Sequence, residues 1–176
     1  MKKVMIAAAL ASIVSGSALA AVTTPGGTIH FKGFITEDGC SVSTSANEPV
    51  SLGTVQKSAF TTSGDVSTKV PFKIELTNCP ASFITAAVTF KGTESSTAGV
   101  LALDTTTSTA EGVGIRISDD KGKDVDINSA SDPYALTAGG GSTTLNFDAQ
   151  YYALVDNADI TAGQADGIVD FDMTYN

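Results

Sequence analysis

The sequence predicts an all-β domain, an antiparallel sandwich or barrel, for two reasons. From Ile29 to Tyr175, short segments that alternate between apolar and polar residues are separated by clusters of Gly, Ser, Thr, Asn and Asp. Such regular spacing of strands and turns is typical of antiparallel β folds. Helical periodicity is almost absent from the same region.

The first 20 residues, MKKVMIAAALASIVSGSALA, have the layout of a secretory signal peptide. Two lysines precede an apolar run from Val4 to Val14, and the small-residue triplet 18–20 supplies a cleavage site after Ala20. The apolar run is shorter than the roughly 20 residues that a transmembrane helix needs. We therefore expect an exported chain that does not insert into the membrane.

Cleavage after Ala20 leaves residues 21–176, enough for one domain with a single core. Because Lys2 and Lys3 leave with the signal peptide, the formal charge falls from −9 to −11. A chain with this charge repels phosphate backbones, so we expect no nucleic-acid partner.

Cys40 and Cys79 are the only cysteines of the chain. An even count in an exported protein favours a disulfide over reactive thiols. Structural zinc needs four Cys or His ligands at close spacing, and two cysteines with one histidine do not supply them.

Seven segments are expected to be strands, and residues 118–124 between two of them, SDDKGKD, a polar turn around Gly122. In VPFKIELTNC, Phe72, Ile74 and Leu76 alternate with polar residues, which indicates a half-buried strand. The seven segments are 70–79, 86–92, 99–105, 112–118, 123–128, 143–155 and 167–175.

Both ends of the mature chain alternate cleanly, in TTPGGTIHFKG (23–33) and in GIVDFDMTY (167–175). The first has Gly27, Ile29 and Phe31 on one face and Thr28, His30 and Lys32 on the other; the second has Val169, Phe171, Met173 and Tyr175 opposite Ile168, Asp170, Asp172 and Thr174. Two interpretations are open. The two ends pair within one molecule, or the N-terminal strand fills a gap in a different molecule.

No set of residues supports catalysis, so we expect no enzyme, no cofactor and no metal. A nucleophile would have to use His30, the only histidine, as its base, and His30 falls on the polar face of a terminal strand. The acidic stretch from Asp124 has Ser129 and Ala135 where a calcium loop needs Gly and Glu. Asp170 and Asp172 are better interpreted as solubility or edge-protecting groups than as a catalytic pair.

With these features in place, the chain resembles the pilin subunits of chaperone–usher fimbriae, close to the type 1 major subunits. The resemblance covers nearly all of the mature sequence. It rests on the order and spacing of GGTIHFKGFITEDGCSV, VSLGTV, VPFKIELTNCP, VGIRISDDKG, LNFDAQYYA and the ending DITAGQADGIVDFDMTYN.

The resemblance implies an incomplete immunoglobulin-like β-sandwich, the pilin fold, which lacks its last strand and has an N-terminal donor strand. Residues 1–20 would then be the signal peptide, 21–33 the donor-strand extension and 34–176 the pilin domain. Cys40 and Cys79 match the family's disulfide. The implied groove-facing donor residues are Pro25, Gly27, Ile29 and Phe31, and those of the receiving, chaperone-facing strand are Val169, Phe171, Met173, Tyr175 and Asn176.

The implied function is that of a structural subunit of a fimbrial shaft, polymerised head to tail by donor-strand exchange and supporting cell adhesion. Its partners would be identical or related pilins, a periplasmic pilus chaperone and an outer-membrane usher, and its location the cell-surface fimbrium. A minor or adaptor pilin is an alternative within this class. From another class, a secreted monomeric β-sandwich that binds a ligand remains an alternative.

Overall fold

Two antiparallel sheets make up the computed structural model, which describes residues 38–44, 49–137 and 139–176. The expected signal peptide and the donor extension, with Pro25, Gly27, Ile29, His30 and Phe31, lie outside these residues. The elements are β1 (Ser41–Thr44), η1 (Lys57–Ala59), β2 (Val70–Thr77), β3 (Thr85–Lys91), β4 (Val113–Asp119), β5 (Tyr134–Ala135), β6 (Thr143–Ala153), η2 (Asn157–Asp159) and β7 (Asp170–Tyr175). The predicted all-β class is confirmed.

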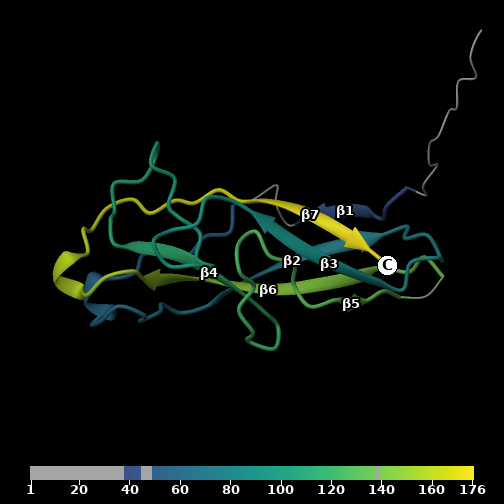
Figure 1. Ribbon diagram of the computed structural model, residues 1–176, viewed down its shortest axis with the longest axis horizontal. Coiled ribbons are helices and arrows are strands. Elements are labelled where there is room, and N and C mark those ends of the chain that lie inside the picture. The colour runs from purple at the N-terminus through teal and green to yellow at the C-terminus, as the bar shows by residue number, and fades with distance from the viewer. Residues whose placement is uncertain (1–37, 45–48, 138) are drawn as a thin grey trace, which may run out of the picture. The chain divides into compact units, whose positions relative to one another are not determined.

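The first sheet has the strand order β1-β2-β6-β4, and the second has the order β5-β3-β7 (Figure 1). All pairs of neighbouring strands are antiparallel. Both helical elements are single 3₁₀ turns, and in the described part of the chain no helix is long and apolar enough to cross a membrane.

The core lies between the two sheets, because alternate residues of each strand point inward. In β2, Ile74 and Leu76 are buried, as the alternation predicted. Phe147 of β6 is at the centre: its ring lies 5.2 Å from that of Phe90 in the opposite sheet and 5.5 Å from that of Phe72. Edge-on and offset contacts of this kind stabilise the packing beyond the area that they bury.

The prediction of a strand is wrong for two of the seven segments. Residues 99–105 and 123–128 make only isolated bridges to β4, through Leu101 to Ile115 and through Asp124 to Ser118. Gly99 begins the first segment and Asn128 ends the second, and both have left-handed backbone conformations, so neither segment continues as a strand past these residues. The two segments instead cover the outer edge of β4 with a few hydrogen bonds, which protects that edge from other strands.

The predicted turn between residues 118 and 124 is confirmed. The Asp119 carboxylate accepts hydrogen bonds from the backbone N–H groups of Lys121 and Lys123, at 2.9 and 2.8 Å. Gly122 has a φ of 82°, a conformation that favours glycine.

Cys40 and Cys79 form the predicted disulfide. It joins the residue before β1 to the chain just after β2, next to the Ser41–Thr77 pair of the ladder. Both cysteines are buried in the main core. The covalent link therefore fixes the start of β1 to the sheet.

Replacing Phe147 with Ala should lower the free energy of unfolding by about 3–5 kcal/mol, because the ring is fully buried among three other aromatic rings. The check is urea unfolding followed by circular dichroism. Val66→Ala, at a side chain that is 43% exposed, is the matched control and should change stability by less than about 0.5 kcal/mol. Equal losses in the two variants would contradict this description of the core.

Candidate functional site: an open groove beside the C-terminal strand

Strand β7 is at the edge of its sheet and pairs with β3 alone among the described strands. Thr85 and Asn176 exchange both backbone hydrogen bonds, at 3.0 Å each. In an antiparallel ladder, hydrogen-bonded pairs alternate with pairs that are not hydrogen-bonded. Thr174 and Asp172, two and four residues before Asn176, therefore also exchange backbone hydrogen bonds with β3. The N–H and C=O groups of Phe171, Met173 and Tyr175 consequently point toward the open edge.

The two faces of β7 differ as the sequence alternation predicted. Phe171, Met173 and Tyr175 are half-buried and pack against the main core, as does Val169 just before the strand. Asp170, Asp172 and Thr174 are exposed, and Ile168 is 71% exposed. The residues with inward side chains are thus the same residues whose backbone groups face the open edge.

A groove of about 890 Å³ lies beside the part of the chain just before β7. One wall is the segment 165–169, which leads into β7, and the other is the segment 49–53. Its floor consists of core side chains, mainly Phe72, Leu101, Ile115, Ile117 and Tyr151. An apolar floor open at the surface is what remains when a sandwich has room for one more strand.

The opposite wall, residues 49–53, was not assigned from the sequence. Leu52 packs against the core, and Val50 is 43% exposed. No backbone–backbone hydrogen bond joins residues 49–55 to another described residue. The alternation of Val50 and Leu52 in PVSLG was the available signal, but five residues are too few to separate a groove wall from an ordinary loop.

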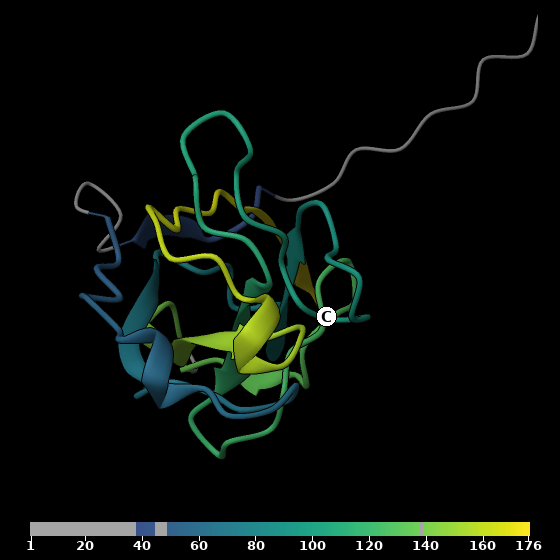
Figure 2. The same ribbon diagram turned by 90° about the vertical axis from the view of Figure 1, so that its left-hand side faces the viewer.

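A second hollow of about 460 Å³ continues the groove away from the end of β7. It shares Gly53, Tyr151 and Asp166 with the first and lies over a smaller core that includes Phe60 and Ile160. In the chain that leads to β7, residues 161–166 accept hydrogen bonds from the backbone N–H groups of residues 104, 109, 110 and 111. The Tyr151 hydroxyl also donates a hydrogen bond to the Ala165 carbonyl, at 2.8 Å. Figure 2 shows this yellow segment beside the green loop.

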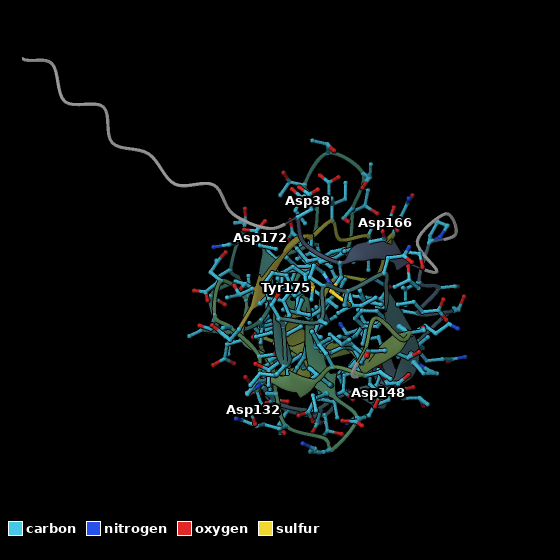
Figure 3. All side chains as sticks on the ribbon, turned by 90° about the vertical axis from the view of Figure 1, so that its right-hand side faces the viewer. Asp38, Asp132, Asp148, Asp166, Asp172 and Tyr175 are labelled. Atoms are coloured by element: carbon cyan, nitrogen blue, oxygen red, sulfur yellow. A yellow bond between two sulfur atoms is a disulfide. The ribbon has the colours of Figure 1, made fainter. Side chains whose placement is uncertain are left out.

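Tyr175 packs at the other end of β7. Its ring lies 5.2 Å from that of Phe83, and a Cβ added to Gly39 would be only 2.9 Å from it. Burial raises the pKa of the Tyr175 hydroxyl, and a hydrogen bond with the Cys40 backbone partly opposes this. Figure 3 shows Tyr175 within the body and Asp38, Asp166 and Asp172 at its periphery.

The structure therefore brings together part of the predicted site. Val169, Phe171, Met173 and Tyr175 line up along one open edge, and the backbone of Asn176 continues the ladder with Thr85. The described residues hold no group of three His, Cys, Asp or Glu side chains that could hold a metal ion. The arrangement offers apolar pockets and unpaired main-chain groups, which suit the addition of a strand.

Comparison with known proteins agrees with this geometry. Residues 29–176 match the family model described as "Fimbrial protein". The chain is 38% identical to the type-1 fimbrial protein A chain of Salmonella typhi, over 99% of this chain and all of the relative. The chain belongs to the fimbrial protein family, and its role is that of a structural subunit of surface fimbriae.

Two solved structures have a similar fold. The P pilus rod subunit PapA is 25% identical, with a TM-score of 0.64 over 79% of this chain and all of that one. A subunit of a chaperone–usher pilus is 26% identical, with a TM-score of 0.60 over 89% of this chain and all of that one. The fold is thus the immunoglobulin-like sandwich of pilins, as the resemblance implied.

We expect stability to fall as the pH rises past about 10, the ordinary pKa of tyrosine. Burial raises the pKa of Tyr151 and Tyr175, so their stabilising contribution is complete below that pH and is lost as the pH rises through the folded-state values. The double variant Tyr151→Phe/Tyr175→Phe should lose less stability between about pH 8 and 11. The check is the urea midpoint across this range; identical pH profiles for the two proteins would contradict the assignment.

Proposed function

We propose that this chain is the shaft subunit of a chaperone–usher fimbrium and that residues 21–33 of one copy complete the sandwich of the next. One observation carries the proposal: an apolar groove lies beside residues 165–169, which lead into the open edge of β7, and its far wall, residues 49–53, has no backbone partner among the described residues. A strand placed there has main-chain groups to bond on both sides.

The energies are compatible with a tight joint. Burying Ile29 and Phe31 contributes roughly 1.5–3 kcal/mol each. Each new backbone hydrogen bond adds about 0.5–1.5 kcal/mol. These terms offset an association cost of roughly 4–15 kcal/mol. Since the donor completes a core instead of covering a surface, the joint also separates slowly.

The same groove would bind the periplasmic chaperone before assembly. Before assembly, its apolar floor and the unpaired backbone of Phe171 and Met173 would favour aggregation. A periplasmic chaperone that lends a strand and holds the Asn176 carboxylate with basic residues protects them, and the outer-membrane usher exchanges that strand for a neighbour's extension. Because the contact joins two different surfaces, it repeats without closing and produces a filament.

Fusing residues 21–33 after Asn176 through a short flexible linker should raise the melting temperature of residues 34–176 well above that of the same domain without them. The fused strand fills the groove of its own chain and yields a stable monomer. Calorimetry and size-exclusion chromatography measure both effects, and a fused segment of scrambled sequence is the control. If the domain is already stable alone and the fused strand changes nothing, the groove is not a strand acceptor and a secreted monomeric binding domain becomes the better account.

Phe31→Asn should reduce the yield of assembled fimbriae, because it removes about 1.5–3 kcal/mol of apolar burial from the joint. Thr28→Asn, on the opposite face of the same strand, is the matched control and should leave the yield near that of the wild type. Electron microscopy and the amount of sheared filament provide the measurement. Equal yields from the two variants would contradict the assignment of the inward face.

A further inference from the structure

The charges of the donor segment and of the body have opposite signs. Residues 21–33 contain Lys32 and His30 and no acidic residue, whereas all 19 acidic residues of the chain belong to 34–176. Three of these acids, Asp166, Asp170 and Asp172, are exposed along the strand and its lead-in segment beside the groove. This inference rests on the proposed function, because it concerns the same groove and the same donor.

The shape of the groove determines which way the donor runs. The groove, of about 890 Å³, lies beside Val169 and Gly167, whereas Tyr175, Phe83 and Gly39 are closely packed at the other end of β7. The bulky donor residues, Ile29 and Phe31, require the groove. Gly27 and the residues before it then lie toward Tyr175, so the donor is antiparallel to β7.

Aligning the inward donor residues with those of the receiving strand sets the register. Phe31 lies opposite Val169, and Ile29 lies opposite Phe171. The outward residues are then paired as well, because opposite positions of an antiparallel pair share a face. His30 comes to lie opposite Asp170, and Lys32 comes to lie opposite Ile168.

We propose that Lys32 and His30 of the incoming copy form a cross-strand charge ladder with Asp166, Asp170 and Asp172 of the receiving copy. In this register Lys32 has Asp170 as its diagonal neighbour on one side and Asp166 on the other, within reach of its long side chain. Lys91 of β3 also lies opposite Asp170, so that carboxylate faces one ammonium group on each side.

The ladder also accounts for an exposed apolar side chain. Ile168 is 71% exposed and lies between Asp166 and Asp170 in the sequence. The aliphatic stem of Lys32 covers it while the ammonium group remains at the level of the carboxylates, as long basic side chains commonly do. The outward face of the joint thereby selects a basic donor strand and disfavours an acidic one.

A charge swap in the full chain tests the ladder. In a host that assembles the wild-type chain into fimbriae, the variants are Lys32→Glu, Asp170→Lys and the double variant, and the readout is dissociation of purified fimbriae in urea at low ionic strength. Fimbriae of each single variant should dissociate roughly two- to fivefold faster than those of the wild type. Fimbriae of the double variant should dissociate at nearly the wild-type rate. If Lys32→Glu alone forms no fimbriae, the double variant should form them again.

Asp120→Lys, on the exposed turn after β4, is the matched control and should not rescue Lys32→Glu. Added salt should reduce the differences between the variants. If the effects of Lys32→Glu and Asp170→Lys simply add, or if Asp120→Lys rescues equally well, the ladder is overturned.

A separate arm distinguishes this failure from failure of the proposed function. A chain without residues 21–33 should form no fimbriae. If it still forms them, donor-strand exchange is wrong and the ladder is wrong with it. If the chain without residues 21–33 forms no fimbriae, but the effects of Lys32→Glu and Asp170→Lys simply add, only the ladder is wrong.

Discussion

The unpaired edge of β7 is the constraint on which the rest of this molecule depends. In a sandwich, the inward side chains of an edge strand need cover, and its backbone groups need partners or water. Here Phe171, Met173 and Tyr175 meet both needs only in part: their side chains pack against the core, and their main-chain groups have no partner strand among the described strands. In the proposed assembly, the donor strand of a neighbouring copy provides both the missing cover and the missing hydrogen bonds.

The surrounding structure keeps this edge open and regular. The Cys40–Cys79 disulfide fixes the residue before β1 to the sheet, and Tyr175 packs on Phe83 and close to Gly39. At the opposite end of β7, hydrogen bonds from residues 104–111 and from the Tyr151 hydroxyl hold the segment that leads into it. The groove thus lies beside the segment that leads into β7, and the other end of β7 is closely packed; in the proposed joint this difference sets the direction of the donor strand.

The sequence predicted those features that depend on local alternation. The two faces of residues 167–175 and the turn at Gly122 follow from neighbours in the chain, and two cysteines allow only one pairing. Residues 99–105 and 123–128 were predicted as strands, since alternation alone does not show that these segments make only isolated bridges to β4. The wall at 49–53 was missed because it lies across from residues more than a hundred positions away, a long-range contact that no short pattern encodes.

Amide hydrogen exchange along β7 tests the central claim most directly. In the domain without residues 21–33, the N–H groups of Asp172 and Thr174 should be protected by β3, whereas those of Phe171 and Met173 should exchange rapidly. In the assembled fimbria all four should be protected. If Phe171 and Met173 are already protected in the domain alone, or remain unprotected in the fimbria, no strand is added at this edge.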